Sequence, residues 1–276
     1  MKTLIHVNSP LTAIVALSYI DQKKEHSEIY VTISRIKSLS NWFLHLDNVR
    51  LVGGFSETDL CDLSNTLIVP HDYVDNEKYV KYIHRGNIKN VHYIEEGDLS
   101  WLGSRYHPDR KRIFNIKKCN IPIVGKMFDK MVFSRDQAYI TLSQECFNFA
   151  SNKKKIIVNV DRDTFEFYPR FFTESSKVVL AGTYTYEKDI SNFQKINKEK
   201  TMDFYIKPHP LIFRNKILLK KFNFYLKKNN LSDRIIDRAD VSLELESLFS
   251  KIEIYGAETS IQRYEKFFPY KFFSLS

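Results

Sequence analysis

Three short polar clusters in this sequence combine residue types that can carry out chemistry. They are the acid pair in Glu95-Glu96-Gly97, the proline-flanked histidine in Lys207-Pro208-His209-Pro210, and the hydroxyl pair Thr259-Ser260. Each cluster follows a short apolar run that predicts a buried β-strand. Because loops at the carboxyl ends of strands converge on the ligand crevice of an open α/β sheet, the clusters are candidates for one site. An acid, a histidine and paired hydroxyls are what a metal-free transfer from a phosphate-activated donor requires.

Each cluster supplies a group with a defined chemical capacity. A carboxylate in a partly desolvated crevice can act as a general base on a hydroxyl. Prolines on both sides of His209 hold its imidazole in an extended loop, from which it can donate to a phosphate oxygen, and Lys207 adds positive charge nearby. Hydroxyls and free N–H groups at a helix start bind phosphate well, a role open to Thr259 and Ser260.

Every cluster also has a simpler structural explanation. An acid pair before a glycine is typical of a solvated turn, a histidine between prolines fits a rigid turn, and Thr or Ser at a helix start is an ordinary N-cap. Neighbouring side chains of a strand point to opposite faces, so only one of Glu95 and Glu96 can face a crevice while the other pairs or caps. Taken singly, the motifs leave both explanations open.

The elements that must position these clusters are short apolar strands alternating with helices, which predicts parallel sheets covered on both faces. The chain opens with a strand, a loop at Asn8-Ser9-Pro10 and a helix, for which Pro10 suits the first turn. The strands expected in this half are Leu4–Val7, Ile29–Ile33, Val49–Val52, Thr66–Val69, Asn90–Ile94 and Lys155–Val160, with helices over Leu11–Ile20 and Asn76–His84.

The pattern restarts after a weakly periodic segment, Asp163–Ser176, that we interpret as a linker. We therefore predict two Rossmann-like domains facing a cleft, residues 1–165 and 166–276. Gly182 and Thr183 follow the first strand of the second half, and we expect them on the donor side. The strands expected here are Lys177–Leu180, Met202–Ile206, Arg234–Ile236 and Lys251–Tyr255, with an amphipathic basic helix over Asn215–Asn229 and a helix capped by Ser242 over Ser242–Phe249.

Composition excludes several classes of protein and leaves others open. The net charge of +9 attracts nucleic acid, anionic lipid or an anionic substrate without choosing among them. Neither half contains a G-x-G-x-x-G or Walker loop, and the chain has only eight glycines, which disfavours dinucleotide or P-loop chemistry. The sequence begins without a signal-peptide layout and has no membrane-spanning apolar stretch. Three scattered cysteines, Cys61, Cys119 and Cys146, form neither a disulfide framework nor a zinc site, so we expect a cytoplasmic protein.

Two further segments have competing interpretations. Asp161-Arg162-Asp163 has the D-x-D spacing of a metal motif, but no second carboxylate or histidine cluster supports it, and we interpret it as a solvated turn with no metal. The run Arg263–Phe273 interleaves basic and aromatic residues. We favour a helix that packs its phenylalanines on the core, while peripheral contact with the cytoplasmic face of the inner membrane stays open.

In their order along the chain, the three clusters resemble the signature of bacterial CMP-sialic acid-dependent sialyltransferases, which share an acidic D/E-D/E-G motif, an HP motif and a late Ser/Thr pair. The group most similar is glycosyltransferase family 52, the lipooligosaccharide sialyltransferases, with the bacterial polysialyltransferases related. Asn8-Ser9-Pro10-Leu11 also resembles the first strand and loop of these enzymes. The resemblance implies the two-domain GT-B arrangement.

The resemblance also implies a role for each cluster. The first acid of the motif is the general base, which implies Glu95, with Glu96, Gly97, Asn8 and Ser9 in support. The HP histidine contacts the donor phosphate, which implies His209, beside Lys207 and Pro210. The hydroxyl pair holds that phosphate, which implies Thr259 and Ser260. A glutamate at the start of the preceding helix binds the cytidine ribose; Glu244 fits best and Glu246 is a rival, although the family usually has proline where Ser242 stands.

The sequence therefore predicts an inverting, metal-independent sialyltransferase that uses CMP-sialic acid and a glycan acceptor such as the terminal galactose of bacterial lipooligosaccharide or capsule. No metal or other cofactor is expected, because protein donors can stabilise the charge of a leaving monophosphate. A transferase of another CMP-activated acid sugar is the first alternative. A basic nucleic-acid-binding protein is the second, although no nucleic-acid-binding motif is recognisable and we expect no such partner.

Overall fold

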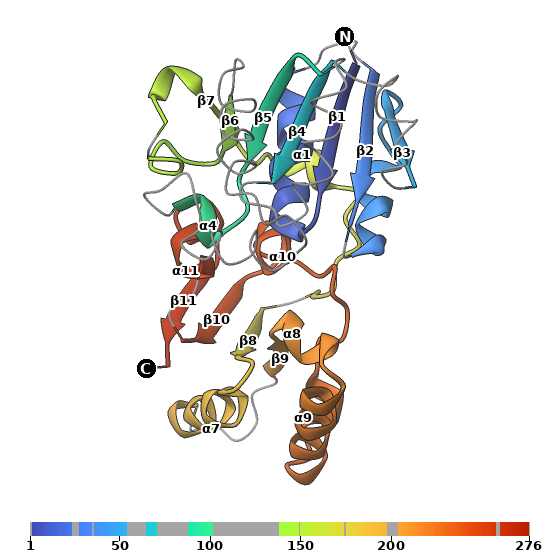
Figure 1. Cartoon of the computed structure of the whole chain (residues 1–276). Coiled ribbons are helices and arrows are strands. Elements are labelled where there is room, and N and C mark those ends of the chain that lie inside the picture. The colour runs from blue at the N-terminus through green and yellow to red at the C-terminus, as the bar shows by residue number, and fades with distance from the viewer. Residues whose placement is uncertain are drawn as a thin grey trace, which may run out of the picture. The chain divides into compact units, whose positions relative to one another are not determined.

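The computed structural model describes residues 2–23, 28–34, 36–53, 65–70, 88–101, 138–148, 150–173, 175–197, 204–257 and 260–275. The chain divides into two compact units, Met1–Phe167 and Tyr168–Ser276. Each unit contains a parallel sheet, as the alternation of strands and helices predicts (Figure 1). The predicted helix over Asn76–His84 lies outside the described residues.

The first unit is built on a seven-stranded parallel sheet of order β3-β2-β1-β4-β5-β6-β7. Helix α1 follows β1 directly. Pro10 stands at its start, and the Ser9 hydroxyl accepts from the Thr12 amide 3.2 Å away, as an N-cap does. The strands are β1 Lys2–Val7, β2 Glu28–Ile33, β3 Val49–Val52, β4 Thr66–Pro70, β5 Asn90–Ile94, β6 Tyr139–Thr141 and β7 Lys155–Ile157; the helices are α1 Pro10–Lys23 and α4 Asp98–Trp101, and the 3₁₀ turns are η1 Lys37–Phe43, η2 Asn152–Lys154 and η3 Asp163–Phe165.

The second unit has a four-stranded parallel sheet of order β11-β10-β8-β9. Its apolar core joins the sheet to helices α7 and α9 through Ile190, Phe193, Ile206 and Phe222, all buried. The strands are β8 Ser176–Ala181, β9 Phe204–Pro208, β10 Ile252–Gly256 and β11 Lys271–Ser274; the helices are α7 Tyr186–Ile196, α8 Pro210–Arg214, α9 Lys216–Lys228, α10 Leu243–Phe249 and α11 Ser260–Tyr264, and η4 is a 3₁₀ turn at Ser232–Arg234.

Two sequence-based expectations for the second unit differ from the observed elements, and in the first unit the strand expected over Lys155–Val160 ends at Ile157. The strand expected at Arg234–Ile236 is reduced to a single bridge between Ile206 and Ile235, because the residues before it form the turn η4. The aromatic C-terminal run is a short helix, α11, followed by strand β11 instead of one helix. Its residues Tyr264, Phe268 and Tyr270 are buried, whereas Phe273 is 39% exposed, so the run packs on the core only in part.

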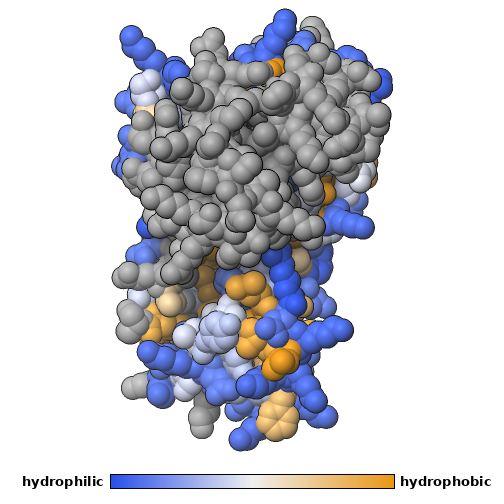
Figure 2. Space-filling model, in the orientation of Figure 1, coloured by the Kyte–Doolittle hydropathy of each residue, from blue (hydrophilic) through white to orange (hydrophobic). Residues whose placement is uncertain are grey.

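Among the described residues, no helix combines the length and the apolar character needed to cross a membrane. Most of the coloured side chains on the face in Figure 2 are hydrophilic, with hydrophobic side chains exposed among them over the second unit. Asp161 and Asp163 form a local turn, in which the Asp163 amide donates to the Asp161 carboxylate, as expected for a solvated turn.

Candidate active site

The carboxyl ends of β1 and β5 bring two of the predicted site residues of the first unit into contact. Asn8, directly after β1, donates through Nδ2 to Oε1 of Glu96 at 2.5 Å, although the two residues are 88 positions apart. The Thr12 hydroxyl in turn donates to Oδ1 of Asn8 at 2.7 Å and lies 2.5 Å from the Ser9 hydroxyl. Asn8 is buried, so its amide is fixed at both ends and orients the half-buried Glu96 carboxylate.

Glu95 faces the opposite way and is 0% exposed. Its Oε2 accepts from the Thr141 hydroxyl at 2.6 Å and from the Leu142 amide at 2.8 Å, while its Oε1 accepts from Nε1 of Trp101 at 3.0 Å. The carboxylate thus ties the end of β5 to the end of β6 and to α4. A buried carboxylate with three donors stabilises the local fold. In this structure both carboxylate oxygens of Glu95 accept hydrogen bonds from other groups of the protein.

The turn after the acid pair explains the glycine of the motif. Gly97 has a φ of +69°, in the left-handed region that glycine adopts without steric cost. The turn lets the Ser100 hydroxyl accept from the Glu96 amide at 2.8 Å, which fixes the backbone at the second acid. Cys146 lies below this turn, and burial, with the nearby charge of Glu95, raises the pKa of its thiol, so it is a structural and not a reactive cysteine.

In the second unit, the ends of neighbouring strands β8 and β9 bring Thr183 to His209. The His209 amide donates to the carbonyl of Ala181 at 2.8 Å. Its Nδ1 accepts from the Leu211 amide at 3.2 Å, as the N-cap of α8, and lies 3.0 Å from the Thr183 hydroxyl. Because a backbone N–H can only donate, Nδ1 is the acceptor nitrogen and the proton of the neutral ring is on Nε2.

The environment of His209 favours that neutral ring. Partial burial, and secondarily the charge of Arg214, lowers the pKa of His209 below its ordinary value. The residue is exposed, and Pro210 forms the first turn of α8 directly after it. A neutral imidazole with its donor on Nε2 can give a hydrogen bond to an anionic oxygen at this edge of the sheet.

The loop that carries Thr183 is anchored by a buried carboxylate. Asp189 accepts from the Gly182 amide at 2.9 Å and from the Thr185 hydroxyl at 2.8 Å, both through Oδ2. A Cβ at position 182 would lie 2.3 Å from Oγ1 of Thr185, so only glycine fits there. The loop therefore presents Thr183 to His209 in a fixed conformation.

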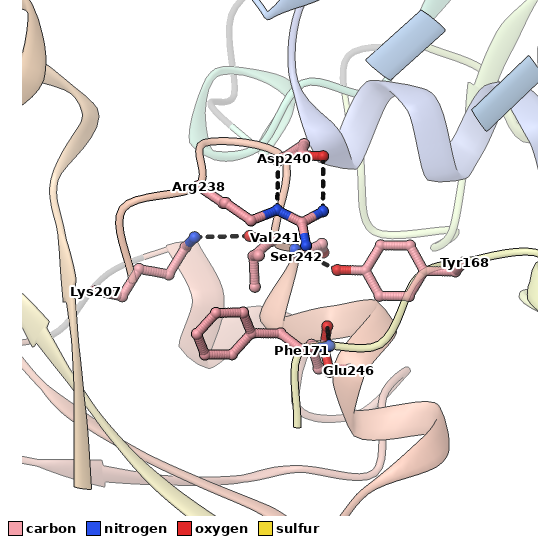
Figure 3. Close-up of polar contacts among 8 residues, drawn as sticks. All are labelled: Tyr168, Phe171, Lys207, Arg238, Asp240, Val241, Ser242 and Glu246. Carbon is pink, nitrogen blue, oxygen red and sulfur yellow. Dashed lines mark hydrogen bonds and ion pairs between the residues drawn. The ribbon is translucent and has the colours of Figure 1, made fainter. Parts of the chain in front are cut away.

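A second group of polar contacts surrounds the start of α10 (Figure 3). Nζ of Lys207, from β9, donates to the Val241 carbonyl at 2.6 Å. The Tyr168 hydroxyl accepts from the Ser242 amide at 3.1 Å, and Arg238 pairs with Asp240 at 3.1 Å. Desolvation lowers the pKa of Lys207 to about 8, against the opposing effect of nearby acids. Those acids are Glu244, Asp240 and Glu246.

The two glutamates considered for the ribose contact have different surroundings. Glu246 is 0% exposed, and its two oxygens accept from the amides of Phe171 and Phe172 at 2.8 and 3.1 Å. Glu244 is half-buried in the first turn of α10, where it accepts from the Ser242 hydroxyl at 2.6 Å. Ser242 is also the helix N-cap, as predicted. The geometry leaves Glu244 as the candidate for contact with a ligand.

Thr259 and Ser260 are the hydroxyl residues predicted to hold the donor phosphate. Thr259 lies outside the described residues, and Ser260 begins α11, after the carboxyl end of β10. The sequence did not predict Tyr168, Arg238 or Asp240, because these residues lie outside helices and strands and belong to no motif. The only sequence signal near them is the clustering of charged residues from Arg234 to Asp240.

Comparison with known proteins supports the fold and does not assign a family. No protein-family model matches the sequence, and no curated protein matches it either. Among solved structures, MnaA from S. aureus, determined with UDP, is similar at a TM-score of 0.54 and 13% identity, over 95% of this chain and 75% of that one. An α/β-galactoside α-2,3-sialyltransferase from the luminous marine bacterium Photobacterium phosphoreum is similar at 0.53 and 12% identity, over 95% and 87%. At these identities the likeness shows the fold alone, which is the GT-B type with two parallel-sheet units.

Proposed function

We propose that this chain is an inverting, metal-independent glycosyltransferase that moves sialic acid from CMP-sialic acid to a hydroxyl of a glycan acceptor. The observation that carries the proposal is the fixed pair of Thr183 and His209 at the carboxyl edge of the second sheet. A neutral histidine whose proton is on Nε2 suits a phosphate oxygen of the donor. The similarity of fold to a bacterial sialyltransferase, and the order of the three motifs, support this choice of donor.

In this proposal the donor side belongs to the second unit. His209 donates to the departing phosphate, Thr259 and Ser260 add further donors, and Glu244 accepts from the ribose hydroxyls. Lys207 holds the Val241 carbonyl beside the N-cap of α10 and so positions Glu244. Fixed donors aimed at developing charge lower the barrier to bond breaking without a metal.

We assign the general base to Glu96 in place of Glu95. Glu95 is fully buried and its oxygens accept three hydrogen bonds, whereas a base must reach the acceptor hydroxyl. Glu96 is half-buried as a residue; its Oε1 accepts from Asn8, which orients the carboxylate, and its Oε2 is a buried atom. In the proposed step the acceptor oxygen attacks the anomeric carbon as its proton passes to Glu96. The bond from that carbon to the phosphate oxygen breaks with its electron pair, and CMP leaves from the opposite face.

The direct test is release of CMP and transfer of sugar with CMP-sialic acid and a galactose-terminated oligosaccharide, with and without EDTA. We expect transfer in both conditions, and parallel reactions with other CMP-activated acid sugars, UDP-sugars and ADP-sugars identify the donor. Transfer only from another CMP-activated acid sugar would mean that the proposed sugar is wrong and that the proposed mechanism of transfer still holds. Absence of both transfer and donor hydrolysis across a broad acceptor panel would contradict the proposal.

The role of His209 can be separated from its structural role as an N-cap. In His209→Asn the side-chain oxygen can still accept from the Leu211 amide, so α8 should persist. We expect turnover to fall by about 10²-fold or more with unchanged thermal stability, because a phosphate donor is displaced. Wild-type turnover in this variant would remove His209 from the mechanism.

A further inference from the structure

Helix α9 packs one face into the core of the second unit. Its opposite face is exposed among the described residues. Phe222 and Leu226 are buried in the core of the second unit. Ile217 and Phe224, seven positions apart and so on one face of the helix, are 69% and 71% exposed. Exposed apolar side chains are ordinary when single, but two on one helical face form a stripe with no role in packing the unit.

Lysines flank this stripe and α9 itself contributes no acid, although Glu187 of α7 lies beside Tyr225. Lys220, Lys221 and Lys228 each lie three or four positions from Ile217 or Phe224, which places them on the same face, and all three are exposed. The thirteen residues Lys216–Lys228 contain no Asp or Glu. Lysines in the last turn are explained by the helix dipole, but this does not account for Lys220 and Lys221.

We propose that α9 binds an anionic lipid surface, with Ile217 and Phe224 in the interface between headgroups and acyl chains. Lysines beside an apolar stripe match the pattern of a helix that lies in such an interface, and their charge complements anionic headgroups. A nucleic acid would use the lysines but not the exposed isoleucine. A second copy of the same face would bring lysines against lysines.

This surface is separate from the C-terminal aromatic run, whose Tyr264, Phe268 and Tyr270 are buried. It is also connected to the candidate site. Asn215 joins α8 to α9, and its side chain caps α9 through the amides of Ile217 and Leu218. Because His209 caps the other end of α8, a surface-bound α9 would hold His209 near that surface. The inference itself does not depend on the proposed transfer reaction.

The test is co-sedimentation of the full chain with vesicles of phosphatidylcholine alone and of phosphatidylcholine mixed with phosphatidylglycerol. We expect binding to the mixed vesicles only, weakened by salt. The double variant K220E/K221E should lower the partition coefficient by about tenfold or more, because each lysine contributes to attraction by anionic lipid. The variant I217S/F224S should also lower the partition coefficient. Its remaining binding to the vesicles should be more sensitive to salt than that of the wild type.

The matched control is K153E/K154E, which makes the same charge change in the exposed turn η2 of the first unit. We expect this control to bind vesicles nearly as well as the wild type, and circular dichroism should show all variants folded. If K153E/K154E lowers the partition coefficient as much as K220E/K221E does, the binding depends on the net charge of the protein. That result would overturn the assignment to α9. Failure of the wild type to bind mixed vesicles would overturn the proposal, as would a stable dimer dissociated by I217S/F224S or tighter binding to duplex DNA or RNA that depends on Lys220 and Lys221.

Discussion

Each unit contains a pair of neighbouring glutamates, and in each pair the two members have opposite surroundings. Glu95 and Glu246 are fully buried and accept backbone amides, in one case with a hydroxyl and an indole as well. Glu96 and Glu244 are half-buried, and each accepts a hydrogen bond from a polar side chain, Asn8 or Ser242.

The difference in burial indicates that the two glutamates of each pair have different roles. A buried carboxylate whose oxygens are occupied holds separate segments together: β5, β6 and α4 for Glu95, and the start of the second unit with α10 for Glu246. A half-buried carboxylate oriented by a polar side chain is the better candidate to bind a ligand or take a proton. We therefore expect the buried glutamates, Glu95 and Glu246, to control stability. The half-buried glutamates, Glu96 and Glu244, should control activity.

The largest expected effect on stability is that of Glu95→Ala. It leaves the Thr141 hydroxyl, the Leu142 amide and the Trp101 indole without their acceptor, so we expect a loss of about 3 to 5 kcal/mol in unfolding free energy. Both tryptophans of the chain, Trp42 and Trp101, belong to the first unit, so urea denaturation followed by tryptophan fluorescence reports on that unit. Glu96→Gln is the matched control, expected to lose less than about 1 kcal/mol because it keeps an oxygen for Asn8. Similar losses in both would remove the distinction between the two acids.

The corresponding change in the second unit, Glu246→Ala, should have a smaller effect. It deprives two amides of an acceptor, those of Phe171 and Phe172, and we expect a loss of about 2 to 3 kcal/mol. The second unit has no tryptophan, so far-UV circular dichroism during urea denaturation is the measurement. Glu244→Gln should cost less than about 1 kcal/mol, since its oxygen can still accept from the Ser242 hydroxyl. A larger loss in Glu244→Gln than in Glu246→Ala would reverse the assignment.

The smallest effect is a pH dependence from Lys207, which lies close to the second pair. Its pKa is lowered from 10.5 to about 8, so the folded protein binds fewer protons than the unfolded chain between these values. Stability from this residue therefore rises as the pH increases from about 8 to about 10.5, and the cost of burying the charge is fully present below pH 8. Measured against Lys207→Met, the wild type should gain relative stability across that window. A constant difference across the window would contradict the burial of a charged Lys207.

Much of the framework was predictable from local patterns. Short apolar runs separated by helical segments predicted both parallel sheets, and the ends of those strands do carry the candidate residues. The contact between Asn8 and Glu96, and the contact between Thr183 and His209, follow from the rule that parallel strands end at a common edge. The N-cap role of Ser242 was visible from its position at the start of the predicted helix.

What the sequence could not decide was the orientation of each glutamate. Glu95 and Glu96 are identical in type, and the burial of one depends on Thr141 and Leu142, which lie 46 and 47 positions away. The strand that ends at Thr141 has only three residues, too few to produce a periodic signal. The contact of Tyr168 with the Ser242 amide spans 74 positions and likewise has no local pattern.

The central claim, that Glu95 serves the fold and Glu96 serves the chemistry, is tested most directly by donor turnover in Glu95→Gln and Glu96→Gln. Both variants should be assayed with CMP-sialic acid and acceptor at a temperature where each is folded. We predict that Glu96→Gln loses about 10² to 10⁴ in turnover at wild-type stability, as expected for removal of a general base, while Glu95→Gln is less stable but keeps most of its turnover. A Glu95→Gln variant that is as stable as the wild type and inactive, beside an active Glu96→Gln, would contradict the account.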